Sequence, residues 1–194
     1  QTDFRIEIVI GEDCSTDNTL AICREYAECY SEQVVLLSGP KNMGITANYF
    51  RTLKACTGEL IGDIAGDDFY CDDHALEKQR QYLSLHPEVG VMGANGYQYF
   101  VRRNQLVEGL NPIITAETSK AKEFYFSKNY IGGVYLKPIG IMFRSEMLKY
   151  IDYDEIIRRQ LPVEDYPIQA IWSQHTKFAC LPDLLVTYRV YGES

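Results

Sequence analysis

Strand-like and helix-like segments alternate through the first hundred residues of the chain. The run Ile6–Ile10 is rich in β-branched residues and ends at Gly11, which is typical of a strand buried in a parallel sheet. Apolar residues spaced by three and four then predict a helix over 19–31. The same alternation continues with strands at 34–37, 59–64 and 89–101, and with helices from 47 to Gly58 and over 73–86. The sequence therefore predicts an α/β fold with helices flanking a mostly parallel sheet.

The second half of the chain is less regular. Helices are predicted over 120–130, from Ser145, and from Pro167 to residue 175, with strands at 140–143, 178–181 and 185–190. The chain has 194 residues, close to the size of one domain, and it contains no internal repeat or low-complexity linker. We expect a single domain over 1–194, with a first half of about 1–101 and a second half of about 102–194.

Charge and composition exclude several classes of protein. The 27 acidic residues outnumber the 19 basic ones, giving a net charge of −8 without a basic cluster, so nucleic acid is not an expected partner. No apolar stretch approaches the length of a transmembrane helix. The six cysteines show no metal-site spacing, so they are interpreted as reduced thiols of a cytoplasmic protein.

Acidic pairs follow two of the predicted strands. Glu12 and Asp13 come after the first strand, and Asp67 and Asp68 come after the third. Ligands of open parallel sheets bind beyond the carboxyl ends of the strands, where crowded carboxylates favour a hard divalent cation. Each pair alone is also explained by turn formation and helix capping. Their occurrence at equivalent strand ends favours a binding site, and no glycine-rich phosphate loop offers another explanation.

A third acidic pair, Glu164–Asp165, precedes the helix that begins near Pro167. Acidic side chains stabilise a helix N-terminus, so a structural role explains the pair. A carboxylate in a partly dry site can also accept the proton of an attacking hydroxyl group. Both interpretations are open from the residues alone.

Five motifs occur in the order seen in family 2 glycosyltransferases, which the chain resembles from its first residues to its last. They comprise Glu7–Thr19 (EIVIGEDCSTDNT), Asn42–Gly44, Gly58–Ile61 with Gly66–Asp68, Glu164–Pro167 and Tyr188–Ser194. The resemblance is to bacterial members that act on cell-surface polysaccharide or lipopolysaccharide, and it implies the Rossmann-like GT-A fold. The first half of the chain would bind a nucleotide sugar, and the second half would bind the acceptor.

The resemblance implies donor-binding roles for the first two acidic pairs and one loop. Asp13, with Glu12 beside it, would contact the nucleotide base, usually uracil. Residues Asn42, Gly44 and Asn48 would help enclose the nucleotide. Asp67 would bind the ribose and, with Asp68, a Mg²⁺ or Mn²⁺ ion that bridges the diphosphate.

The resemblance also assigns the third acidic pair and an acceptor region. Asp165 matches the catalytic base of the family, and Glu164 would support it. Acceptor recognition is expected around Gly132–Ile141 and the helix that follows Asp165, where Tyr130, Tyr135 and Tyr166 are candidates for stacking on sugar rings; packing is the alternative role of these tyrosines.

Two positions depart from the family pattern, and both remove an expected metal ligand. Ala65 stands at the first acid of the Asp-x-Asp motif, so the ribose or metal contact of that acid is missing unless Asp63 or Asp68 supplies it. Tyr191 stands where the family often has His. Weaker metal binding is therefore expected. The chain also begins without Met and enters a strand almost at once, so about thirty residues, one strand–helix unit, are expected to be missing at its start.

The implied activity is transfer of a sugar from a nucleotide diphosphate donor to a hydroxyl of a glycan or glycolipid acceptor. A UDP-sugar is the first candidate for the donor. Transfer would invert the anomeric carbon, and the enzyme would be of the hexosyltransferase type. The implied location is the cytoplasm, including the inner face of the membrane. Two alternatives are a sugar-nucleotide-binding protein that has lost catalysis and, less well matched, a phospho-receiver-like signalling domain.

Overall fold

The computed structural model describes residues 4–113, 136–160 and 164–192, and the chain forms two compact units. The first unit comprises Gln1–Gly58 and Asp152–Glu164, and the second comprises Glu59–Ile151 and Asp165–Ser194. A single domain over the whole chain stays a prediction. The predicted helix over 120–130 lies outside the described residues.

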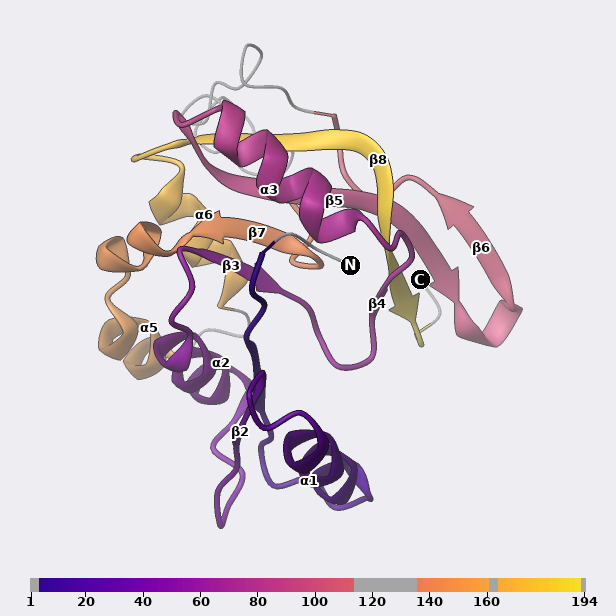
Figure 1. The fold of residues 1–194 in the computed structure, drawn as a ribbon, viewed down its shortest axis with the longest axis vertical. Helices are drawn as coiled ribbons and strands as arrows, with labels where there is room; N and C mark the ends of the chain where they lie inside the picture. Colours follow the sequence, from indigo (N-terminus) through magenta and orange to yellow (C-terminus); the bar gives the residue numbers. More distant parts are fainter. Residues whose placement is uncertain (1–3, 114–135, 161–163, 193–194) are drawn as a thin grey trace. The chain divides into compact units, whose positions relative to one another are not determined.

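A two-stranded parallel sheet forms the centre of the first unit. Strand β1 (Ile8–Gly11) pairs with β2 (Val34–Leu37) in a register that joins Ile8 to Val34, and helix α1 (Thr19–Cys29) connects them. Helix α2 (Ile45–Ala55) packs against β1, and α1 packs against β2. The predicted strand, helix and strand are confirmed here (Figure 1). The β-branched runs form strands because their branched side chains suit a pleated, partly buried surface.

A short helix that the sequence pattern did not predict completes the first unit. Helix α5 (Tyr153–Arg159) places the Tyr153 ring edge-on to the buried Phe50 ring of α2, with centroids 5.0 Å apart. The Asp152 side chain caps α5 by accepting the Glu155 backbone N–H at 3.0 Å. Ile156 is the buried residue of α5, so the helix has no apolar stripe for a sequence pattern to detect.

A six-stranded mixed sheet forms the centre of the second unit. Its order is β3-β7-β5-β8-β4, and β6 pairs with β5. The strands are β3 (Leu60–Asp63), β4 (Phe69–Tyr70), β5 (Val89–Phe100), β6 (Gln105–Glu108), β7 (Ile141–Arg144) and β8 (Lys177–Val190). Helices α3 (Ala75–Leu85) and α6 (Asp165–Trp172) pack in this unit, and short 3-10 helices lie at Val101–Arg103 and Ser145–Tyr150. Figure 1 shows α3 lying across β5 and β8.

The α/β class is confirmed, but this larger sheet is less parallel than the alternation of elements predicted. The β5–β8 pair is parallel, whereas the β3–β7, β5–β7, β5–β6 and β4–β8 pairs are antiparallel. Antiparallel neighbours need no helical crossover, so strands from the irregular second half insert between and beside those of the first half. The two strands predicted at 178–181 and 185–190 are one strand, β8, which continues through Pro182 with register shifts against β5.

The core of the second unit includes residues between the sheet and α3, where Leu83 packs with Met92 and Ala179, and residues between the sheet and α6. The Trp172 and Phe143 rings are buried with centroids 4.6 Å apart, and the Trp172 Nε1–H donates to the Met147 carbonyl at 2.9 Å. The indole therefore buries a large apolar surface while its one polar group stays hydrogen-bonded.

Two expected absences can be compared with the structure. In the described part of the chain, no helix is both long and apolar enough to cross a bilayer. All six cysteines lie among the described residues, and none forms a disulfide.

Candidate functional site

The Asp13 carboxylate organises a loop that lies thirty residues further along the chain. Its Oδ1 accepts the Met43 backbone N–H at 2.8 Å, and its Oδ2 accepts the Gly44 N–H at 2.9 Å. The Asn42 side chain donates to the Asp13 carbonyl at 2.8 Å. Gly44 has a φ of +88°, a left-handed conformation that favours glycine, so the residue suits the turn into α2. The structure thus joins two of the motifs that the sequence places far apart.

Helix α2 contributes two further polar side chains to the same cluster. The Asn48 side chain donates to the Gly11 carbonyl at 2.8 Å. Arg51 donates to the Glu12 carbonyl at 2.9 Å and also contacts the side-chain oxygen of Asn48. Sequence reasoning did not select Arg51, although it follows Asn48 by three residues and so shares its face of the helix. A Cβ atom on Gly11 would lie 1.9 Å from the Thr52 hydroxyl oxygen, so α2 can approach β1 this closely because residue 11 is glycine.

Glu12 lies inside this cluster rather than at the surface. Its side chain is 3% exposed, and its Oε1 accepts the Ser15 backbone N–H at 2.6 Å. The hydrogen bond from Ser15 lowers the pKa of Glu12, because it stabilises the ionised form. Among the described residues its other oxygen has no hydrogen-bond partner. We refer to Glu12, Asp13, Asn42, Gly44, Asn48 and Arg51 as the first cluster.

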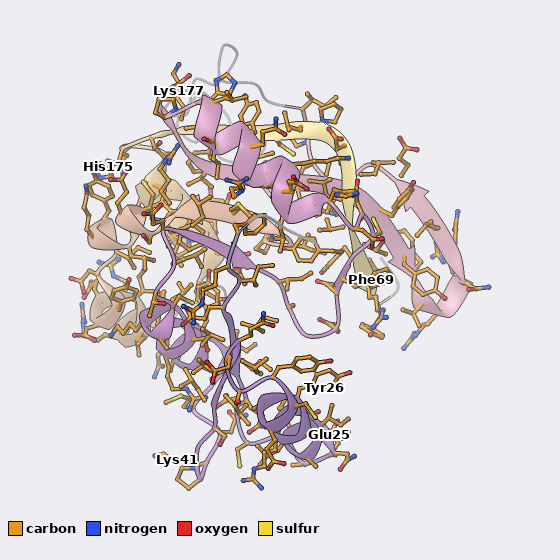
Figure 2. The ribbon with its side chains drawn as sticks, in the orientation of Figure 1. Glu25, Tyr26, Lys41, Phe69, His175 and Lys177 are labelled. Carbon is orange, nitrogen blue, oxygen red and sulfur yellow. The ribbon has the colours of Figure 1, made fainter. Side chains whose placement is uncertain are left out.

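In the second unit, Asp67 and Asp68 occupy the turn between β3 and β4 and differ in environment. Asp68 is half-buried, and its Oδ1 accepts the Arg189 backbone N–H of β8 at 2.8 Å. Burial raises the pKa of Asp68, because it disfavours the charged carboxylate. The Arg189 guanidinium lies 5.1 Å from the centroid of the Phe69 ring, which Figure 2 labels. Asp67 is exposed.

The residues here fit a divalent cation that is shared with a phosphate ligand. In the portion of the chain that the structure describes, no group of three or more His, Cys, Asp or Glu side chains is arranged to hold a metal. Asp67 is the exposed carboxylate, whereas Asp68 already binds a backbone donor. Mg²⁺ is commonly held by one or two carboxylates together with substrate phosphates, so Asp67 with a diphosphate is a sufficient donor set. Burial raises the pKa of the Tyr70 phenol to about 12, and the nearby Asp63 charge contributes to the increase.

Asp165 is the first residue of α6, and Glu164 immediately precedes it. The Asp165 Oδ1 accepts the Tyr166 backbone N–H at 2.7 Å. One turn further on, the buried Gln169 side chain accepts the Leu136 N–H at 3.2 Å and donates to the Leu136 carbonyl at 2.8 Å. Residues four apart share a helix face, so this reciprocal pair anchors the face of α6 that carries Asp165.

The predicted acceptor region is described in part. Tyr130, Tyr135 and the Gly132–Gly133 pair lie outside the described residues. Tyr166 is 38% exposed on α6. At the two departures from the family pattern, Ala65 accepts the Asp68 N–H in the turn, and Tyr191 is exposed just after β8.

Comparison with known proteins supports the family resemblance. Residues 1–149 match the profile of Glycosyl transferase family 2. The uncharacterised protein Rv1520 of Mycobacterium tuberculosis (strain H37Rv) is 38% identical over 91 residues, which are 47% of this chain and 26% of that protein. The chain therefore matches only about a quarter of that relative's length.

Two solved structures share the fold. The crystal structure of S. aureus TarS 1-349 superposes with a TM-score of 0.64 at 20% identity, covering 96% of this chain and 53% of that one. The mannosyltransferase PcManGT from Pyrobaculum calidifontis, solved with GDP-Man and Mn²⁺, gives a TM-score of 0.59 at 16% identity, covering 93% of this chain and 47% of that one. The expected GT-A fold is confirmed by these neighbours. With more than half of its length matched by the family profile, the chain belongs to glycosyl transferase family 2.

Proposed function

We propose that the chain transfers a sugar from a nucleotide diphosphate donor to a hydroxyl of a glycan or glycolipid acceptor, in polysaccharide or glycolipid synthesis. The observation that carries the proposal is the first cluster, in which motif residues from 11–13 and 42–51 are joined by hydrogen bonds. A UDP-sugar is the first candidate donor, because a carboxylate that retains lone pairs can accept the N3–H of uracil. GDP-sugars are the second candidate, supported by the GDP-Man bound to PcManGT.

The proposed reaction inverts the anomeric carbon and assigns a proton acceptor. The acceptor oxygen forms a bond to the anomeric carbon while the bond from that carbon to the diphosphate oxygen breaks. The acceptor proton passes to Asp165, with Glu164 in support, and the nucleotide diphosphate leaves with the electron pair. A divalent cation, Mg²⁺ or Mn²⁺, bound beside Asp67 would stabilise the charge on the leaving diphosphate. A hexosyl donor and a cytoplasmic location, at the inner face of the membrane for glycolipid acceptors, are parts of this proposal.

The Ala65 and Tyr191 departures favour a second candidate, a sugar-nucleotide-binding protein that has lost catalysis. A panel of UDP- and GDP-sugars, assayed for release of nucleotide diphosphate and for transfer to glycan acceptors, separates the two. Transfer supports the enzyme. Tight binding of a nucleotide sugar without turnover, with or without Mn²⁺, would leave the binding protein as the better description.

We expect the Asp13→Ala variant to bind UDP about tenfold more weakly, the effect of losing a charge-assisted contact. The variant loses the acceptor of the Met43 and Gly44 N–H groups, so the loop is no longer held in place. Isothermal titration calorimetry measures the change. The control is Asp17→Ala, because exposed Asp17 also accepts a backbone N–H, from Thr19, in the same unit. Equal UDP affinity in both variants would contradict the role of Asp13.

We expect Mn²⁺ to bind detectably only when UDP is present, because Asp67 alone offers too few ligands for a tight site. Asp67→Asn should remove the gain in UDP affinity that Mn²⁺ provides, about tenfold or more. Calorimetric titrations of UDP with and without Mn²⁺ test this expectation. The control is Asp73→Asn, another exposed acid of the second unit. A UDP affinity in Asp67→Asn that still rises with Mn²⁺ as in the parent would exclude Asp67 as the ligand.

A further inference from the structure

Lys137 is a half-buried cation in the second unit. It lies in the 132–141 range where the sequence analysis expected acceptor recognition, but no motif named this residue. Its Nζ donates to the Gln98 side-chain oxygen at 2.7 Å and lies 5.5 Å from the centroid of the Tyr188 ring. Gln98 and Tyr188 are paired residues of β5 and β8. Among the described residues, no carboxylate forms an ion pair with Lys137, and burial lowers the pKa of its ammonium group. A partly desolvated charge without a counter-ion is costly, and such groups are concentrated at functional sites.

The backbone around Lys137 is fixed by hydrogen bonds on both sides. The Lys137 N–H donates to the Asn111 side-chain oxygen at 2.8 Å, and the Ile139 N–H donates to the Lys137 carbonyl at 2.8 Å. The preceding residue, Leu136, is bonded through both its N–H and its carbonyl to Gln169. Because Gln98 also holds the Nζ, the ammonium group is positioned before any ligand arrives. Such preorganisation reduces the entropy lost on binding.

Contacts within the second unit connect Lys137 with two acidic residues of the candidate site, Asp68 and Asp165. Through Leu136 it is joined to Gln169, which lies one helical turn from Asp165 on the same face of α6. Through Tyr188 it neighbours Arg189, whose backbone N–H is bonded to Asp68. Contacts within the second unit thus link Lys137 to the segments to which the proposed function assigns the diphosphate and the acceptor.

We propose that Lys137 is a substrate-binding residue that contacts an anionic oxygen of a phosphate or carboxylate group, and this inference rests on the proposed function. Two of the three N–H groups of the ammonium remain for a ligand once Gln98 has taken one. Tyr188 is 37% exposed and provides an adjoining aromatic surface for a sugar. The anion belongs either to the donor diphosphate or to an acidic acceptor, and binding experiments separate these two sources.

The test compares the full chain with its Lys137→Met and Lys137→Arg variants. Methionine keeps the length of the side chain and its packing on Tyr188 but removes the charge, whereas arginine keeps the charge. The matched control is Lys149→Met, because the exposed Lys149 also has its Nζ above a tyrosine ring, 4.8 Å from the centroid of Tyr150. Lys137→Gln gives a second neutral variant if Lys137→Met melts at a lower temperature than the parent.

If the donor supplies the anion, Lys137→Met should bind pyrophosphate and UDP about 10- to 100-fold more weakly, the range for one hydrogen bond to a charged group. Uridine affinity should not change, and Lys137→Arg should recover part of the loss. If the acceptor supplies the anion, UDP affinity is unchanged. The KM for an acidic acceptor then rises about 10- to 100-fold, and the KM for a neutral acceptor does not change.

Unchanged pyrophosphate and UDP affinities, together with unchanged transfer kinetics for acidic acceptors, would overturn the role of Lys137. An equal loss in the Lys149→Met control would also overturn it, since the effect would then reflect net charge alone. Failure of the proposed function looks different. In that case the parent chain binds pyrophosphate through Lys137 but transfers no sugar from any nucleotide sugar.

Discussion

Replacement of Asp165 by asparagine should reduce sugar transfer by about 10²- to 10⁴-fold, the usual contribution of a general base. The amide keeps the shape of the carboxylate, and its oxygen can still accept the Tyr166 N–H that Asp165 binds at 2.7 Å. It cannot take a proton from an attacking hydroxyl group at neutral pH. We therefore expect a folded protein that binds UDP with the affinity of the parent but transfers sugar far more slowly.

The measurement combines single-turnover transfer with calorimetric titration of UDP. Asp154→Asn is the control, because Asp154 is also an acid in the first turn of a helix, α5, and has no assigned role. Glu164→Gln should have a smaller effect than Asp165→Asn, since Glu164 is proposed only to support the base. Transfer by Asp165→Asn at the rate of the parent would reject Asp165 as the proton acceptor. A drop in UDP affinity equal to the drop in rate would indicate a binding role instead.

Local patterns predicted the elements whose residues form a repeated apolar face. The strand at 34–37 is β2 with the predicted bounds, and the strand at 89–101 is β5, which ends at Phe100. Strands β4 and β6 were not predicted, because β4 has two residues and all four residues of β6 are exposed. Neither strand has the alternation of buried and exposed residues that a sequence pattern can detect. The mixed pairing of the larger sheet depends on contacts between distant segments, which local periodicity does not report.

The site residues that lie in short sequence motifs were predictable. Those whose roles depend on contacts between distant segments were not. Asp13 and Gly44 were selected by motif order, and the structure joins them directly. Arg51 lies within helix α2 and outside the quoted motifs. Lys137 and Gln169 fall in the region expected to bind the acceptor, but no motif distinguishes either residue from its neighbours. Their roles depend on partners far along the chain, such as Gln98 for Lys137, 39 residues away.

Gln169 illustrates how such a distant contact supports both stability and the site. Its side chain is 1% exposed, and it forms two hydrogen bonds with the backbone of Leu136, which is itself fully buried. These bonds satisfy a buried N–H and a buried carbonyl that would otherwise have lost their contacts with water. They also join the helix that begins at Asp165 to the segment that carries Lys137.

Replacement of Gln169 by leucine, which has a similar volume, should lower the free energy of unfolding by about 2–4 kcal/mol. Each buried group left without a partner costs about 1–3 kcal/mol, and the added apolar surface offsets part of that loss. Urea denaturation measures the change, and Gln174→Leu is the control because Gln174 is exposed just beyond the same helix. At temperatures where Gln169→Leu stays folded, we also expect weaker pyrophosphate binding and slower transfer, since Leu136 no longer fixes the backbone of Lys137. Stability equal to that of the control, with unchanged transfer, would mean that the Gln169–Leu136 pair neither stabilises the second unit nor positions the site.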